Sequence, residues 1–267
     1  TLLTVHDLSF LRYPGTFVPA LRRYLERVVP RSIARADLVL ADSAHTRFDI
    51  VSLLSVPPVK VQVLYSGVPP RFQPQPEPGE AERIRTHHSL GERSYVLSVG
   101  TLQPRKNHVR LMRAFSQLTN RPSLQLLIAG GRGWLCQDIL AEAGKHTDRV
   151  RILGFVDEAD LPALYRSAVL FVFPSLYEGF GLPVLEAMAC GVPVVCSNAS
   201  ALPEVAGDAA LLVDPLDTGG LAKAMARVLE DTDLRREMIA RGLAQAARFT
   251  WEQAARQLLD VFASLHP

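Results

Sequence analysis

The stretch VLFVFPSLYEGFGLPVLEAMAC, residues 169–190, decides the fold. Its first five residues are apolar and predict a buried strand over 169–173, and Pro183 fits the first turn of a following helix. Glu178 lies between the strand and the helix, and Glu186 lies inside the helix. Ligands of open parallel α/β sheets bind at the carboxyl ends of strands, where a helix start offers free N–H groups to an anion. The segment therefore predicts an anion site flanked by two carboxylates.

The two acids differ in their surroundings. Glu178 precedes Gly179 and Gly181, and such glycines indicate that the backbone approaches another group closely or adopts a positive φ. Glu186 is surrounded by apolar residues of the helix, where a charge is costly without a partner. We therefore expect a ligand hydroxyl or a cation beside Glu186, and the alternative is a carboxylate stabilised by the helix dipole alone.

Composition limits the classes of function. The 267 residues, 48% hydrophobic, are enough for more than one domain. The chain has 29 Lys and Arg against 27 Asp and Glu, a net charge of +2, which argues against a nucleic-acid-binding protein. Its apolar runs are much shorter than the roughly 20 residues of a membrane span. The three cysteines follow no metal-ligand spacing and are expected to be reduced core residues of a cytosolic protein, with neither disulfide nor zinc: Cys136, Cys190 and Cys196.

The pattern along the chain predicts two α/β units joined by a linker. Glycines and prolines crowd residues 67–79, as is typical of a linker. Beyond it, apolar runs alternate with helical stretches and predict a doubly wound parallel sheet. The expected strands of this sheet are 95–99, 124–129, 150–153, 169–173, 192–196 and 210–213. Before the linker we expect a strand ending at Val5, helices over 18–36 and 46–54, and strands over 37–41 and 60–64.

These units give the expected domains. Residues 1–66 form the last part of an N-terminal domain, 67–248 a complete C-terminal domain, and 249–267 a helix that packs back on the first domain. Thr250 can cap that helix, which is amphipathic from Trp251. Because the chain opens at Thr1 without an initiator Met and without a signal peptide, we interpret it as a fragment whose first part is missing.

A second informative loop, VGTLQPRKNH at residues 99–108, follows the first strand of the C-terminal domain. At the carboxyl edge of a sheet, Arg105 and Lys106 can hold two phosphate groups, one by its planar fork and one as a point charge. The alternative is a solvated cation pair before a helix capped by Asn107. The dipeptide alone favours the solvated pair, but its position at a strand end beside Gly100 makes the phosphate site more competitive with that alternative.

Other motifs are weaker. The glycines of residues 130–133 lack the spacing of a dinucleotide fingerprint and predict a turn or a phosphate-proximal loop. His6 follows a strand and can face a cleft between domains, although a loop histidine is the commoner case. Arginines recur from Arg22 to Arg35 at helical spacing, which suits an anionic membrane surface but more often marks a solvated face. The remaining histidines lack metal-ligand spacing and receive no role: His45, His87, His88, His108, His146 and His266.

Together these residues resemble the retaining, nucleotide-sugar-dependent glycosyltransferases of family 4, which have the two-domain GT-B fold. Glu178 and Glu186 fit the E-x7-E motif of that family. The resemblance includes residues 99–107, the strand end at 153–156, the linker start at 66–68 and the segment from Thr4 to Asp7. It covers nearly the whole chain and implies two Rossmann-like domains, of which the C-terminal one is complete here.

The resemblance also implies roles. Glu178 would meet hydroxyls of the transferred sugar, and the backbone of Gly179, Phe180, Gly181 and Leu182 would donate to the sugar and diphosphate. Glu186 would bind the ribose. The diphosphate would be held by Arg105 and Lys106, the base would border Phe155 and Val156, and the donor sugar would contact His6. Gly100 and Thr101 would also bind the donor. Some family members carry Arg where this chain has Thr101, so more of the diphosphate charge falls to Arg105 and Lys106.

The implied activity is retaining transfer of a hexose, from GDP-mannose or a UDP-hexose, to a hydroxyl of a glycan or lipid-linked acceptor. Two protein cations at the diphosphate imply no metal and no cofactor beyond the donor. The expected location is cytoplasmic, with peripheral contact at the inner face of the membrane through residues 22–35. Two alternatives stay open: a nucleotide-sugar epimerase of the same fold, and a donor-binding fragment without activity.

Overall fold

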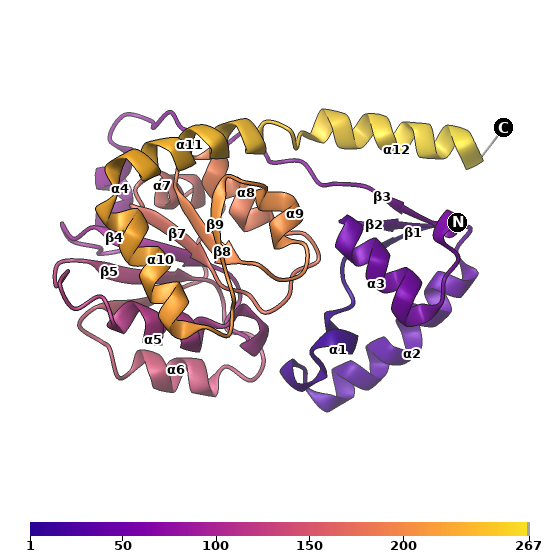
Figure 1. Ribbon diagram of the computed structural model, residues 1–267, viewed down its shortest axis with the longest axis horizontal. Helices are drawn as coiled ribbons and strands as arrows, with labels where there is room; N and C mark the ends of the chain where they lie inside the picture. The colour runs from indigo at the N-terminus through magenta and orange to yellow at the C-terminus, as the bar shows by residue number, and fades with distance from the viewer. Residues whose placement is uncertain (266–267) are drawn as a thin grey trace.

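The computed structural model describes residues 1–265 and consists of two α/β domains (Figure 1). The small domain has three parallel strands in the order β1-β2-β3, with β1 Leu2–Val5, β2 Leu38–Ala41 and β3 Val61–Val63. Its helices are α1 Ser9–Arg12, α2 Pro19–Arg35 and α3 Ala44–Leu54. His266, for which the sequence predicted no metal-binding role, lies outside the described residues.

The large domain has six parallel strands in the order β6-β5-β4-β7-β8-β9. The strands are β4 Tyr95–Val99, β5 Gln125–Ala129, β6 Val150–Gly154, β7 Leu170–Phe173, β8 Val194–Ser197 and β9 Ala210–Val213. Each lies within two residues of its predicted range. The parallel α/β architecture expected from the sequence is therefore confirmed.

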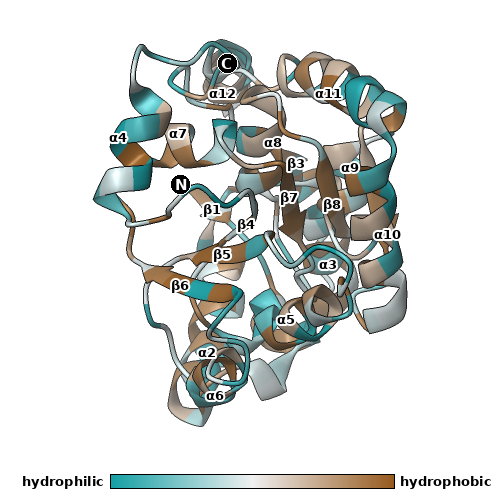
Figure 2. Ribbon diagram, turned by 90° about the vertical axis from the view of Figure 1, so that its left-hand side faces the viewer, coloured by the Kyte–Doolittle hydropathy of each residue, from teal (hydrophilic) through white to brown (hydrophobic). Residues whose placement is uncertain are grey.

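Helices cover both faces of the large sheet. Because side chains alternate along a strand, Leu97 and Phe171 face one core together with α4, α7 and α8, whereas Val96 and Leu170 face a second core with α5, α6 and α10. Figure 2 shows the apolar character of β7 and β8 that this double coverage requires. The helices are α4 Glu80–His87, α5 His108–Ser116, α6 Gln137–Ala143, α7 Leu161–Arg166, α8 Leu182–Ala189, α9 Leu202–Ala206, α10 Thr218–Glu230, α11 Thr232–Ala246 and α12 Trp251–Leu265.

The chain crosses between the domains twice, at residues 64–68 and again at 249–251. The two crossings pack backbone against backbone: the N–H of Val68 donates to the carbonyl of Phe249, and a Cβ at Gly67 would lie 2.2 Å from the backbone nitrogen of Trp251. After the second crossing, α12 lies along the small domain (Figure 1). Val261 packs there with Leu38 and Leu40 of β2.

Candidate functional site

The strand order places two loops together. Strands β4 and β7 are neighbours, yet the chain leaves β4 toward β5 on one side and leaves β7 toward β8 on the other. At such a switch point the loops that follow the two strands diverge and leave a crevice at the carboxyl edge. The loop after β4 carries Arg105 and Lys106, and the loop after β7 carries Glu178. Topology thus joins residues more than 70 positions apart.

Glu178 is held by two cations. Its Oε2 lies 2.8 Å from Nη1 of Arg105, and its Oε1 lies 2.7 Å from Nζ of Lys106. All three side chains are 10–12% exposed. Burial acts to raise the pKa of Glu178, but the charges of Lys106 and Arg105 outweigh it and lower that pKa to about 2. The carboxylate is therefore ionised at neutral pH, and the cluster keeps a net positive charge.

This geometry overturns the interpretation of Arg105 and Lys106 as a solvated pair. Lys106 also lies over the ring of Phe173, with Nζ 4.9 Å from the centroid. Asn107 occupies the N-cap position of α5 but makes no side-chain cap hydrogen bond. Its amide instead donates to the carbonyls of Pro174 and Pro215. The amide therefore ties the loop after β4 to the loop after β7.

Gly179 is the point where the small domain meets this loop. A Cβ there would lie 1.8 Å from the carbonyl oxygen of His6 and 2.8 Å from Cβ of Asp7. The Thr46 hydroxyl donates to the Gly179 carbonyl at 3.1 Å. The imidazole of His6 is largely exposed, and its Nδ1 lies 2.8 Å from Oδ2 of Asp42. The expectation that a glycine here permits a close approach is confirmed.

Helix α8 begins directly after this contact. Gly181 is its N-cap and has φ +121°, a region that side chains disfavour. Among the described residues, no acceptor takes the backbone N–H of Gly179, Phe180 or Gly181, so this turn presents unpaired donors. The Phe180 ring is buried against Tyr65 and Phe249, and Leu182 packs on the same core. The side chains fix the turn, and the backbone remains available.

Glu186 has a partner within the protein. The hydroxyl of Tyr165, on α7, donates to its Oε2 at 2.9 Å. Burial raises the pKa of Glu186, and the Tyr165 hydrogen bond opposes that rise. The hydrogen-bond partner that the protein itself supplies is thus a tyrosine hydroxyl, and a ligand hydroxyl at Glu186 stays a prediction. The carboxylate keeps further capacity to accept hydrogen bonds.

The remaining predicted residues lie around the same edge. Gly100 and the exposed Thr101 follow β4, and Leu102 is tied by backbone hydrogen bonds to Gly131 and Gly133 of the loop after β5. Phe155 follows β6 and is 77% exposed, whereas Val156 packs partly on the core. The exposed ring of Phe155 is available to a flat ligand. The glycine-rich 130–133 segment is a loop in which Arg132 forms an isolated β-bridge with Leu102, and Gly130 has no room for a side chain beside Gly100.

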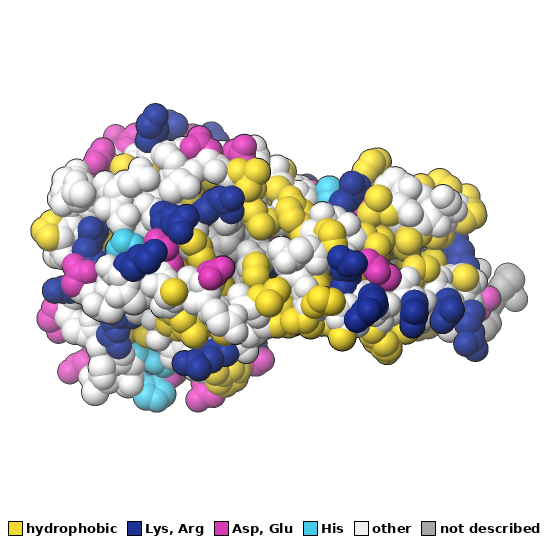
Figure 3. Space-filling model, turned by 90° about the horizontal axis from the view of Figure 1, so that it is seen from below, with side chains coloured by type: hydrophobic (Ala, Val, Ile, Leu, Met, Phe, Trp, Pro, Cys, Tyr) yellow, Lys and Arg dark blue, Asp and Glu magenta, His cyan; other side chains and the backbone are white. Residues whose placement is uncertain are grey.

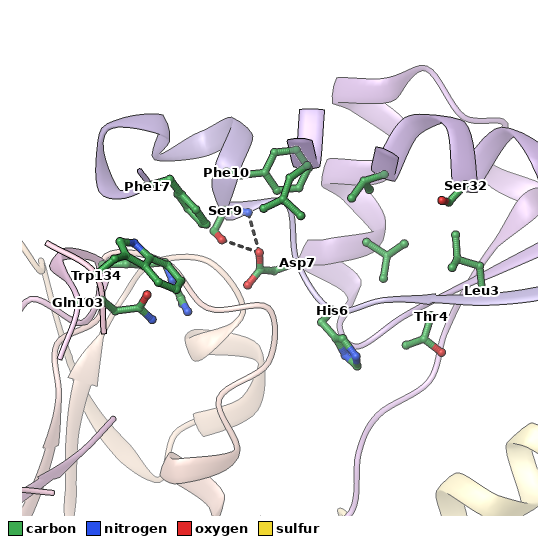
Figure 4. A pocket seen from close by; sticks show the side chains of 14 residues that line it. Leu3, Thr4, His6, Asp7, Ser9, Phe10, Phe17, Ser32, Gln103 and Trp134 are labelled. Carbon is green, nitrogen blue, oxygen red and sulfur yellow. Dashed lines mark hydrogen bonds between the residues drawn. The ribbon is translucent and has the colours of Figure 1, made fainter. Parts of the chain in front are cut away.

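Sequence reasoning missed several residues between the domains. Trp134 donates from Nε1 to the carbonyl of Thr16 at 2.6 Å and packs on Phe17. Both line a cavity of about 370 Å³ that also includes Asp7, Gln103 and Arg105 (Figure 4). The only signal in the sequence was the position of Trp134 directly after the glycine loop. Its partner on the small domain lies 118 positions away.

Glu204 of α9 is a second missed contact between the domains. Its carboxylate accepts from the backbone N–H groups of Ala44 and His45, at the start of α3, and from the hydroxyl of Tyr65. A carboxylate at a helix N-terminus is stabilised by the helix dipole. Glu204 therefore fixes α3 relative to the large domain.

Two of the three cysteines carry an unreactive thiol in this setting. All three are buried and free. Burial raises the pKa of Cys190 and of Cys196 to about 12, so both remain protonated at neutral pH. Their place is in the core, as the sequence predicted.

Comparison with known proteins gives one consistent result. The model of the family described as "Glycosyl transferases group 1" matches residues 80–245. O-antigen chain mannosyltransferase B of Escherichia coli is 38% identical over 98% of this chain and 70% of its own length. Serotype-specific mannosyltransferase WbdA of Escherichia coli is 32% identical over 99% of this chain, which spans only 33% of that relative.

Among solved structures, sucrose-phosphate synthase from Thermosynechococcus elongatus superposes with a TM-score of 0.82. It is 27% identical, and the match covers 99% of this chain and 67% of that one. The parallel sheets described above thus correspond to those of a GT-B glycosyltransferase. On the family match and the 38% identity, the chain belongs to the group 1 glycosyl transferases.

Proposed function

We propose that the enzyme containing this chain transfers mannose from GDP-mannose, with retention, to a hydroxyl of a glycan or lipid-linked acceptor. The observation that carries the proposal is the buried Glu178 carboxylate held by Arg105 and Lys106 at the switch point. The names of two relatives, both mannosyltransferases, support mannose as the transferred sugar.

The leaving group determines what the site must do. As the bond between sugar and phosphate breaks, negative charge grows on the diphosphate, and fixed cations lower the energy of that state. Arg105 and Lys106 supply these cations, and the unpaired N–H groups at residues 179–181 supply further donors. Because Glu178 already orients both cations, little reorganisation is needed when the diphosphate arrives.

The two carboxylates then take separate roles. Glu178, ionised and next to the cations, accepts hydrogen bonds from hydroxyls of the transferred mannose. Glu186 accepts from the ribose, with Tyr165 fixing its orientation. Phe155 offers its exposed ring to the guanine. His6 approaches the sugar from the small domain, beside the contact at Gly179.

Retention requires attack from the face that the diphosphate leaves. Glu178 is a poor covalent nucleophile, because two cations stabilise its negative charge and lower its pKa to about 2. We therefore assign the acceptor proton to a phosphate oxygen of the departing diphosphate. The bond from the anomeric carbon to phosphate breaks as the bond to the acceptor oxygen forms on the same face.

The test uses Arg105→Ala and Lys106→Ala in the full-length enzyme, with Arg256→Ala, an exposed cation on α12, as the control. Turnover of GDP-mannose should fall by roughly 100- to 1,000-fold in the first two variants, the loss typical of removing one transition-state donor. The control should keep wild-type turnover. Unchanged turnover in both site variants would refute the assignment.

Two further measurements separate the alternatives. Incubation of the enzyme with the donor alone should leave the sugar unchanged, whereas an epimerase would form a new sugar nucleotide without acceptor. A thermal-shift series with GDP-mannose, UDP-glucose and UDP-galactose should show the largest stabilisation with GDP-mannose, since stabilisation follows donor affinity. A larger shift with a UDP-hexose would replace mannose in the proposal.

We also propose a peripheral contact with an anionic membrane through α2. Arg23, Arg27, Arg31 and Arg35 are exposed at four-residue spacing, and Figure 3 shows the row of cations along this side of the small domain. Arg22 instead pairs with Glu26. Among the described residues, no helix has the length and apolarity of a membrane span.

The membrane contact is tested by co-sedimentation with vesicles. Each basic residue near an anionic surface contributes about 1 kcal/mol. Arg27→Gln with Arg31→Gln should therefore reduce binding to phosphatidylglycerol vesicles by roughly 30-fold, while binding to phosphatidylcholine vesicles stays weak for both proteins. Equal binding of wild type and variant would contradict the contact.

A further inference from the structure

A cluster of two histidines and one aspartate lies outside the donor site, where the end of α4 meets the start of α7. His87 is the last residue of α4, His88 is its C-cap, and Asp160 occupies the N-cap position of α7. Oδ2 of Asp160 lies 2.6 Å from Nδ1 of His87 and 3.2 Å from Nε2 of His88. The potential ligand atoms of the three residues all lie within 4.8 Å of one another.

The surrounding structure holds two of these side chains in place. Those of His88 and Asp160 are only 13% and 12% exposed, whereas that of His87 is 59% exposed and leaves a path from solvent. Asp160 makes no side-chain hydrogen bond to the helix that it precedes, although aspartate usually does so at an N-cap. Its carboxylate is directed to the two imidazoles instead.

The backbone of the turn is also fixed. Arg151, on β6, donates from Nη2 to the carbonyl of His88 and from Nη1 to that of Ser89. Its guanidinium is thus occupied by backbone oxygens. Two imidazoles and one carboxylate therefore converge from the end of α4 and the start of α7, and only the exposed side chain of His87 is free to adjust.

We propose that His87, His88 and Asp160 form a binding site for a divalent transition-metal ion, represented by Zn²⁺. Two nitrogen ligands and one carboxylate oxygen form a donor set that suits Zn²⁺, whereas Mg²⁺ and Ca²⁺ prefer oxygen alone. Ligands about 2.1 Å from a tetrahedral ion lie roughly 3.4 Å apart, so each imidazole nitrogen needs to move away from Oδ2 of Asp160 by less than about an ångström. A water molecule supplies the fourth ligand.

The ion would join α4 to α7 and so stiffen one edge of the large domain. Residues 154–160, which include Phe155, end at Asp160, and α7 carries Tyr165, the partner of Glu186. Spacing along the chain indicated no metal site at His87 and His88, because Asp160 lies 72 positions beyond His88. The site is independent of the donor chemistry, and its test needs no turnover.

The test measures Zn²⁺ binding to the metal-stripped chain by titration calorimetry and by thermal shift. Wild type should bind one Zn²⁺ and gain stability with it, and Mg²⁺ at the same concentration should give no shift. His87→Ala removes an exposed ligand and Asp160→Asn keeps the size of the side chain, so each should fold and bind Zn²⁺ at least about tenfold more weakly.

The matched control is His146→Ala. His146 also lies beside a carboxylate, with Nε2 3.6 Å from Glu142, but Glu142 is already paired with Arg113 and Lys145. The control should bind Zn²⁺ as wild type does. If wild type binds no Zn²⁺, or if His87→Ala and Asp160→Asn both bind it as tightly as wild type, the proposed site is wrong.

Discussion

Replacing Glu178 by Gln should lower stability and at the same time preserve or strengthen the binding of GDP. The substitution keeps the shape of the side chain and removes the charge that neutralises Arg105 and Lys106, both 12% exposed. The pKa of Glu178 is lowered from 4.5 to about 2. At about 1.4 kcal/mol for each pH unit, that shift corresponds to about 3 kcal/mol of stability. The melting temperature should therefore fall by roughly 10 °C at pH 7.

The pH dependence follows from the direction of the shift. A carboxylate whose pKa is lowered by folding stabilises the native state above its unfolded pKa, here 4.5, and loses that contribution as the pH falls toward 2. The difference between wild type and Glu178→Gln should thus be constant from pH 8 to about pH 5. Below that it should shrink.

Glu142→Gln is the matched control. Glu142 is also paired with an arginine and a lysine, and hydrogen bonds from Arg113 and Lys145 lower its pKa to about 2. It lies far from the switch point in the sequence, on α6, and its cations are more than half exposed, so water can solvate them when the charge is removed. It should show a smaller loss of stability and an unchanged affinity for GDP.

GDP is the chosen ligand because it lacks the sugar and reports on the diphosphate contacts. In Glu178→Gln, Arg105 and Lys106 have no carboxylate to compete with the diphosphate, so the Kd for GDP, measured by calorimetry, should stay equal or decrease. A melting temperature within about 2 °C of wild type would show that the cluster is not a buried ion pair. A Kd at least tenfold higher would show that Glu178 positions the cations more than it competes for them.

Three further predictions concern the edges of the site. Gly179→Ala places a Cβ 1.8 Å from the His6 carbonyl oxygen and must separate the domains by more than an ångström, so kcat should fall about 100-fold while GDP affinity stays within threefold. The control Gly131→Ala, with open space around it, should keep both values. Equal losses in kcat and GDP affinity in Gly179→Ala would contradict this prediction. Because burial raises the pKa of Glu186, GDP affinity should weaken as the pH falls through the pKa of this carboxyl. Tyr165→Phe removes the hydrogen bond that opposes the rise, so the midpoint of this pH dependence, measured by calorimetry from pH 5 to 8, should move to higher pH. An unchanged midpoint would count against the ribose contact. Phe155→Ala should weaken GDP binding by roughly 10-fold, the loss of about 1 to 2 kcal/mol of stacking, and should leave the melting temperature of the free protein within about 1 °C; unchanged Kd would remove Phe155 from the site.

Local patterns predicted the large domain well because its strands are continuous apolar runs, and the inner ones, such as β7 and β8, are fully buried. Tyr95–Val99 and Ala210–Val213 coincide with β4 and β9 to the residue. Strand β8 begins at Val194, two residues later than its apolar run, because hydrophobicity reports burial and not the pairing that defines a strand. Gly179 was also predictable as a position of close approach, although the chemistry of its neighbour was not.

The contacts within the site required the three-dimensional structure. The dipeptide of Arg105 and Lys106 does not by itself reveal whether the two cations are solvated or buried in an ion pair. The ion pair depends on Glu178, which lies on the loop after the neighbouring strand β7. Trp134 and Glu204 were missed for the same reason, because their partners lie on the small domain. Local sequence determines the elements, whereas contacts between them depend on strand order within the large domain and on how the two domains pack.

The double crossing between the domains also constrains how this protein can be recombined with its relatives. Because the crossings near Gly67 and Trp251 pack backbone to backbone, they behave as one structural joint. A hybrid enzyme that exchanges the donor-binding half should therefore take residues 67–248 and keep α12 with the small domain that it covers. A cut made once, after the first crossing, would pair Val261 with a foreign β2 and create a mismatched core far from the active site.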